Sequence, residues 1–289
     1  MTLEITPSGQ ACGATIRGLD LSSPLDGALI RDLRGASAEH HVLAFPDQAM
    51  SDDDLERFTL SFGDFGQDPF IEPIEGREHV IAVHRGADET APVFATSWHS
   101  DWSFQEIPPA ATCLFGRVIP PAGGDTLFAN QHLAAETLPD DLRRRLDGLM
   151  AVHSAGAAYG RGGVYGTAEE EAGVERAMKI VTSDEADATG THPVICRHPD
   201  NGRPAFLGCL GYIQCFEGLD AAESWDLLRE MHRWQTQEHF QYRHVWEANM
   251  LVMWDNRSVL HSATTGFDGY ERLLHRTTLA GTDVPVAAA

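Results

Sequence analysis

From Ile81 onward, the chain consists largely of short apolar runs that end at proline or glycine. Examples are "HVIAVHR", "ATCLFGRVIPPAGG", "NMLVMWD" and "RLLHRTTLAG". Runs of this length suit strands better than helices, and frequent turn residues between them are typical of antiparallel barrels and jelly rolls. The 289 residues, 43% of them hydrophobic, can bury a sizeable core. The sequence therefore predicts a mainly β fold with a barrel or jelly roll at its core, in a single domain over residues 1–289.

Helices are expected to flank this core, because four stretches carry apolar residues at helical spacing. Acidic residues follow Ser51 in one of them, and Asp220 opens another, and both features are typical of helix starts. The predicted helices cover residues 28–39, a stretch that begins at Ser51, and residues 132–153 and 220–240.

Residues 155–190 differ in composition from the rest of the chain. They are rich in glycine, alanine and acidic residues, with weak periodicity. Two interpretations stay open for this segment: a mobile lid and a plain surface excursion.

The charge of the chain limits its partners. Twenty-one basic against 43 acidic residues give a net charge of −22, which repels nucleic acid and anionic membrane surfaces. No apolar run approaches the ~20 residues that span a bilayer. The five cysteines are scattered, and "MTLEITPSGQ" does not resemble a secretory leader. We therefore expect a cytoplasmic protein with no nucleic-acid or membrane partner, and a homo-oligomer, either a dimer or a tetramer.

The stretch "TSWHSDWSF", residues 96–104, places His99 two positions before Asp101 among large apolar side chains. Side chains at i and i+2 of a strand point to the same face, so both can bind one metal ion. A second copy of the pattern, residues 198–200, runs into "PDNGR", whose Asn-Gly pair is typical of a hairpin turn. Context therefore favours a turn there and a metal site at His99.

A third ligand and two arginines lie near the C-terminal end. His261 ends the run "LVMWDNRSVLHSA", and two histidines with one carboxylate form the facial triad that leaves open positions on non-haem Fe(II). In a strand, Arg272 and Arg276 share a face. Their planar guanidinium groups suit a carboxylate or sulfonate, although salt bridges with acidic residues of the chain are the alternative.

Together these motifs resemble the taurine dioxygenase and 2,4-dichlorophenoxyacetate dioxygenase family of Fe(II)/2-oxoglutarate-dependent oxygenases. The similarity extends from about Ile5 to Gly281, through "GATIRGLDLSSPL", "WHSDWSFQEIPPAATCLFGRVIPPAGGDTLFAN" and "MWDNRSVLHSATTGFDGYERLLHRTTLAG". The resemblance implies a double-stranded β-helix, the cupin-like form of the jelly roll.

The resemblance also implies cofactors and their ligands. The expected reaction consumes O2 and hydroxylates a small organic acid (a sulfonate, carboxylate or sulfate ester), while 2-oxoglutarate is decarboxylated to succinate and CO2. Fe(II) would be bound by His99, Asp101 and His261, and the distal carboxylate of 2-oxoglutarate by Thr126 and Arg272.

Three residues bear on the primary substrate. By the resemblance, Arg276 would meet its acidic group. Asp68, in "FGDFGQDPF", stands where the taurine-specific members have a histidine, and an aspartate near an anion repels it. Asp68 would therefore face an amine of the substrate or point to solvent, and taurine itself is disfavoured. Trp102 replaces a smaller residue and would narrow the pocket, which favours a bulkier or aromatic substrate.

Three alternatives stay open. The first is the same chemistry on an amino-acid-like or amine-bearing substrate. The second is a non-catalytic metal-binding β-helix protein, since fold does not determine activity. The third is a zinc hydrolase with the same ligands, which needs a general base near the metal and no arginine for 2-oxoglutarate.

Overall fold

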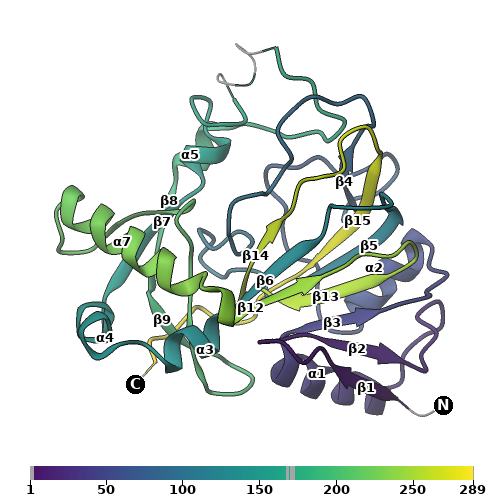
Figure 1. Ribbon diagram of the computed structural model, residues 1–289, viewed down its shortest axis with the longest axis horizontal. Coiled ribbons are helices and arrows are strands. Elements are labelled where there is room, and N and C mark those ends of the chain that lie inside the picture. Colours follow the sequence, from purple (N-terminus) through teal and green to yellow (C-terminus); the bar gives the residue numbers. More distant parts are fainter. Residues whose placement is uncertain (1–2, 167–168, 170–172, 289) are drawn as a thin grey trace.

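The computed structural model describes residues 3–166, 169 and 173–288. Its largest element is a seven-stranded sheet (Figure 1), in which neighbouring strands are antiparallel except for one parallel pair near the N-terminus. The strands lie in the order β1 (Glu4–Pro7), β2 (Ala14–Arg17), β3 (Val42–Phe45), β13 (Leu251–Asp255), β5 (Ala111–Val118), β15 (Arg272–Leu279) and β4 (Ile81–Arg85).

Three smaller sheets complete the β structure. The first of them packs against the seven-stranded sheet, with which it shares an apolar cluster. The other two pack against the helices within residues 131–146 and 221–235. The three sheets consist, in this order, of β12 (Gln241–His244), β6 (Thr126–Asn130) and β14 (Val259–Ala263); of β11 (Ile213–Phe216), β7 (Met150–Ser154) and β8 (Thr189–Pro193); and of the hairpin β9 (Ile195–Arg197) and β10 (Pro204–Phe206).

Strand β13 shows how the core is divided. Its side chains alternate between faces, so Met253 packs toward the helices on one side, whereas Val252 and Trp254 pack toward Phe128 of the facing sheet. A strand that is buried on both faces reads as an uninterrupted apolar run, as this one does. The two facing sheets and their flanking helices confirm the predicted mainly β class.

Most predicted helix starts are confirmed. The side chains of Ser51 and Asp220 each accept a hydrogen bond from the backbone N–H three residues on. In return, the side chains of Asp54 and Glu223 accept from the backbone N–H of Ser51 and Asp220, which completes a capping box at each helix start. The helices are α1 (Gly27–His40), α2 (Asp52–Leu60), α3 (Gln131–Glu136), α4 (Asp140–Leu146), α5 (Gly156–Tyr159) and α7 (Ala221–Gln235), with 3-10 turns at Asp184–Asp187 and Glu238–Phe240.

The single helix predicted over residues 132–153 is wrong. Pro139 separates α3 from α4, because proline cannot donate the backbone hydrogen bond that a helix interior requires. The residues from Met150 onward belong to β7 instead. The predicted helix over residues 220–240 likewise ends earlier, at Gln235.

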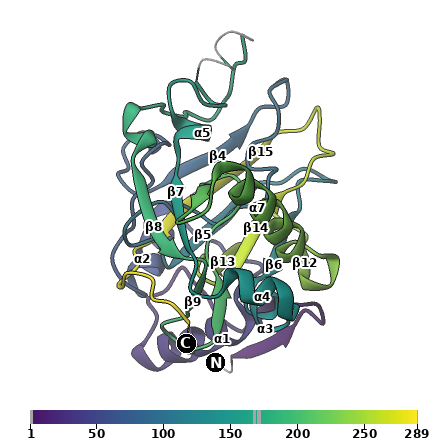
Figure 2. The ribbon, with the colours of Figure 1, turned by 90° about the vertical axis from the view of Figure 1, so that its left-hand side faces the viewer.

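The segment 155–190 is described except for residues 167–168 and 170–172, which lie outside the described residues. Helix α5, in this segment, lies at the opposite end of the molecule from α1 in both views (Figures 1 and 2). Tyr159 and Met178 are buried in an apolar cluster that also contains Trp102. None of the helices in the described part of the chain is long and apolar enough to cross a bilayer.

Three buried histidines lie together where α1 meets the β9–β10 hairpin. The His41 ring is 4.8 Å from that of His132, which is 5.2 Å from that of His198. Burial lowers the pKa of His41 to about 3 and that of His132 to about 4. These two rings are therefore neutral in the folded protein at any pH near 7.

This burial predicts a loss of stability in mild acid. An unfolded histidine binds a proton below a pH of about 6.5, whereas folded His41 does not until far lower pH, so its contribution is complete above about 6.5 and declines as the pH falls. His41→Asn removes one such group, and asparagine tolerates the positive φ of 65° at this position. We expect the pH slope of the unfolding free energy between about pH 6 and 5 to fall by about 1.4 kcal/mol per pH unit.

Urea unfolding at several pH values measures this slope. Replacement of the exposed His239 by asparagine serves as the control and should leave the slope nearly unchanged. An equal slope in His41→Asn and the wild type would contradict the prediction.

Candidate active site

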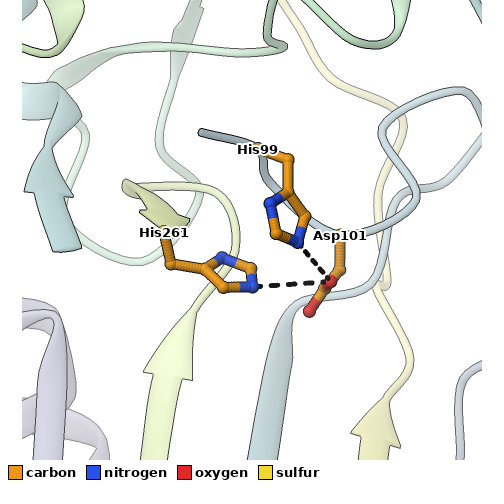
Figure 3. Close-up of side chains that lie close together, drawn as sticks. All are labelled: His99, Asp101 and His261. Carbon is orange, nitrogen blue, oxygen red and sulfur yellow. Dashed lines mark ion pairs between the residues drawn. The ribbon is translucent and has the colours of Figure 1, made fainter. Parts of the chain in front are cut away.

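The structure brings together His99, Asp101 and His261 (Figure 3). The backbone N–H groups of His99 and His261 each donate to the carbonyl oxygen of the other, at 3.0 and 2.7 Å. The Nε2 atoms of the two rings lie 3.9 and 3.7 Å from Oδ1 of Asp101. Two imidazoles and a carboxylate therefore converge on one point, beside strand β14.

The local structure of residues 96–104 differs from the predicted strand. His99 forms only an isolated bridge, and the chain then turns, with Trp102 at a φ of 49°. The turn directs both Asp101 and the Trp102 ring inward, where both are buried. The two metal-ligand candidates still face the same point, but through a turn rather than through strand alternation.

A chain of hydrogen bonds that the sequence analysis missed holds Asp101 in place. Its Oδ2 accepts from the Thr112 hydroxyl at 2.6 Å, and that hydroxyl accepts from the Asn256 amide at 2.9 Å. The side-chain amide oxygen (Oδ1) of Asn256 accepts in turn from Nε1 of Trp254. On the opposite side, Nδ1 of His99 lies 2.8 Å from the Ser97 carbonyl, which leaves Nε2 free to face Asp101.

The protonation states of the three residues suit a metal ion. Burial opposes ionisation of Asp101, but Arg276 and the two histidines outweigh it and lower the pKa of Asp101 to about 2. Burial lowers the pKa of His99, and it lowers that of His261 to about 3. Two neutral imidazoles and an ionised carboxylate are the donor set of non-haem Fe(II) sites, so these residues fit such an ion.

A second group of potential ligands, His198, Asp200 and Asp255, is occupied by an arginine. Arg257 lies 2.6 Å from carboxylate oxygens of both aspartates, and His198 lies 3.0 Å from Asp255. The predicted turn is confirmed, because the β9–β10 hairpin reverses at residues 198–203. The Arg257 guanidinium already balances the negative charge that would attract a metal cation to these aspartates.

Arg272 is a buried cation, and Asp125, the carboxylate that raises its pKa, is itself paired with Arg243. Arg272 is 7% exposed, its Nε donates to the Gly124 carbonyl at 3.2 Å, and the Trp246 and Phe267 rings lie about it. It forms no ion pair with any carboxylate among the residues that the structure covers. Burial lowers the pKa of Arg272 to about 10, so it stays charged at neutral pH. An anion would stabilise this arginine.

Thr126 lies beside the same group of side chains. Its hydroxyl accepts from Nε1 of Trp246 at 3.0 Å, and Trp246 in turn lies against the guanidinium of Arg272. A Cβ atom at Gly124 would lie 3.0 Å from Nε of Arg272, so this position needs glycine. The family resemblance pairs Thr126 with Arg272, but no motif in the sequence points to Trp246, which connects them.

Arg276, four residues further along β15, is paired. Its Nη2 lies 3.0 Å from Oδ1 of Asp68 and 3.2 Å from Oδ2 of Asp101. Asp68 also accepts from Nε1 of Trp102 and from the hydroxyl of Thr278, each at 2.8 Å. Its side chain is only 9% exposed, so Asp68 lies inside the site and the prediction that it points to solvent is wrong.

Aromatic side chains line this side of the site. The Trp102 ring lies 5.6 Å from the Arg276 guanidinium and packs against Phe70 and Tyr159, which stack at 4.9 Å. Tyr212 belongs to the same cluster. Tyr159 and Tyr212 carry no signal in the sequence, because each lies in a segment with no metal-ligand motif.

The comparisons with known proteins agree with this geometry. The model of the taurine catabolism dioxygenase TauD, TfdA family matches residues 4–278. An alkylsulfatase of Acinetobacter baylyi is 33% identical over 93% of this chain and 82% of its own, and an alpha-ketoglutarate-dependent sulfate ester dioxygenase of Pseudomonas putida is 32% identical over 99% and 92%. The crystal structure of a taurine dioxygenase from Burkholderia xenovorans superimposes with a TM-score of 0.80 at 29% identity, over 99% of this chain and 93% of that one.

These matches extend over nearly the whole chain and include every segment that contributes to the site. They also confirm the jelly-roll architecture expected from the sequence. The chain belongs to the taurine catabolism dioxygenase TauD, TfdA family.

Proposed function

We propose that this protein is an Fe(II)- and 2-oxoglutarate-dependent dioxygenase that hydroxylates a small organic acid. One observation carries the proposal: a buried His-Asp-His cluster contacts Arg276 of β15, and Arg272, four residues earlier on the same strand, is buried without an ion pair. A zinc hydrolase or a metal-binding protein without activity has no use for such an arginine, whereas a dicarboxylate cosubstrate needs it.

The site residues divide the work as follows. His99, Asp101 and His261 would hold Fe(II), and Thr126 and Arg272 the distal carboxylate of 2-oxoglutarate. When bound, these two groups supply the oxidising chemistry, in which O2 is consumed, 2-oxoglutarate leaves as succinate and CO2, and the substrate gains a hydroxyl group. The Thr112 hydroxyl keeps Asp101 oriented without competing for Oδ1.

Exclusion of water is the task of the aromatic cluster. Trp102, Phe70 and Tyr159 cover the site on the side of Arg276, and a dry site prevents the oxidant from reacting with solvent or protein. Arg276 would meet the acidic group of the substrate, with Trp102 against its body. Sulfate esters are the first class to test, since two relatives are named for them, and sulfonates and carboxylates offer the same charge.

Four further features are part of the proposal. Residues 1–289 form one dioxygenase domain, and the described part of residues 155–190 acts as a lid, which the burial of Tyr159 and Met178 beside Trp102 supports. All five cysteines are free thiols, which supports a cytoplasmic location. The protein acts as a homo-oligomer. It has no nucleic-acid or membrane partner, in keeping with its net charge of −22.

The decisive experiment is an assay of succinate formation with sulfate esters, sulfonates, aryloxy acids and amino acids as candidate substrates. Stimulation by at least one acid, dependent on Fe(II) and O2, supports the proposal. Absence of Fe(II)-dependent succinate with every acid would refute it.

Removal of one ligand should abolish turnover. In His99→Ala or His261→Ala, two ligands hold Fe(II) too weakly and in the wrong geometry, so we expect succinate formation to fall at least about a hundredfold. These histidine variants are preferable to Asp101→Ala, which also removes a partner of the buried Arg276. His239→Ala, at an exposed histidine, is the control. Full activity in either site variant would exclude the proposed triad.

Arg272→Gln should weaken binding of 2-oxoglutarate and spare the metal. The lost charge-assisted hydrogen bonds amount to about 1.5–3 kcal/mol, so the half-saturating 2-oxoglutarate concentration should rise roughly tenfold to a hundredfold. Calorimetric titration with Fe(II) should give the wild-type affinity. Arg145→Gln, at an exposed arginine paired with Glu230, is the matched control. An unchanged 2-oxoglutarate titration in Arg272→Gln would place the distal carboxylate elsewhere.

A further inference from the structure

The two site arginines of β15 have opposite surroundings. Both are buried, at 7% and 5% exposure. Arg272 has no carboxylate partner among the described residues, whereas Arg276 contacts Asp68 and Asp101 at 3.0 and 3.2 Å. One strand therefore presents one arginine that is free to receive an anion and one that already has its counter-charge.

Asp68 is the carboxylate that stays with Arg276 in the working enzyme. Asp101 is a proposed ligand of Fe(II). The two positive charges of that ion exceed the single negative charge of Asp101, so Asp101 is not left over as a counter-charge for Arg276. Asp68 has no such second partner, and the Trp102 indole and the Thr278 hydroxyl fix its orientation. With both oxygens held and little exposure to water, Asp68 cannot swing away when an anion arrives.

We infer, on the basis of the proposed function, that Asp68 determines the specificity of the site. It makes the site select a zwitterionic acid, whose ammonium group lies close to its acidic group, over a simple monoanion of the same size. A simple anion on Arg276 lies a few ångströms from the Asp68 carboxylate, and repulsion at that distance weakens binding by about tenfold to a hundredfold. An ammonium group beside Asp68 turns that repulsion into attraction. Asp68 has acceptor capacity left, since it receives three donors of the roughly four that a carboxylate accommodates.

Asp68→Asn tests the charge while keeping the shape. The asparagine carbonyl can accept from Trp102 and Arg276 as Oδ1 does now, and its amide can donate to the Thr278 hydroxyl. Asp64→Asn, four residues earlier at an exposed position, removes the same formal charge away from Arg276 and is the matched control.

The probes are hexyl sulfate and 2-aminohexyl hydrogen sulfate, which differ only by the ammonium group. Calorimetry on the enzyme with Fe(II) and 2-oxoglutarate, without O2, gives the two dissociation constants, and assays with O2 give KM and kcat. We expect the wild type to bind the zwitterion more tightly than the anion. In Asp68→Asn the ratio should shift tenfold or more toward hexyl sulfate, through tighter binding and a lower KM with little change in kcat. Asp64→Asn should keep the wild-type ratio.

Two results overturn the inference: a ratio in Asp68→Asn within twofold of the wild type, or no tighter binding of hexyl sulfate by that variant. Failure of the proposed function looks different, because the wild type would then form no Fe(II)-dependent succinate with any acid. A wild-type enzyme that turns over acids, together with an unchanged ratio, counts against the role of Asp68 alone.

Discussion

The negative charge of Asp101 is the constraint on which the rest of the site depends. A carboxylate that is 4% exposed costs several kcal/mol to desolvate, so it persists only where other groups compensate for the loss of water. Compensation comes from the Arg276 guanidinium on β15 and the Thr112 hydroxyl on β5. Because β5 and β15 are paired neighbours in the seven-stranded sheet, the charge is stable only when these two strands are paired.

The same requirement explains why polar groups extend outward from Asp101 in an ordered chain. Thr112, Asn256 and Trp254 satisfy one another in sequence, and Trp254 ends in the apolar core between the sheets. A buried polar network of this kind is favourable when every member finds a partner. Packing of the core therefore holds Asp101 in place as firmly as its direct hydrogen-bond partners do, and this packing makes the site rigid.

Much of the site could be predicted from the sequence, because its clearest features are local or periodic. The alternation that places Arg272 and Arg276 on one face follows a short-range rule, and the comparisons support the family that the motifs suggested. His99 and Asp101 converge as predicted, but through a turn and not through the predicted strand. The split between α3 and α4 was visible in Pro139, but helical periodicity on both sides hid it. The ion pair of Asp68 with Arg276 had no such signal, since it joins β15 to a distant residue in an irregular loop, whose path no spacing rule indicates.

The central place of β13 also affects the order in which the protein can be built. This strand joins the N-terminal strand β3 to β5, with Val42 opposite Trp254, so the partner of β3 is synthesised about 200 residues later. At ribosomal rates of about 5–20 residues per second, that delay is roughly 10–40 s. During this delay, the edge of β3 that pairs with β13 and the apolar side chains that pack against β13 have no native partner. An unpaired strand edge is prone to aggregation, so the risk of aggregation falls on the partly synthesised chain rather than on the finished fold.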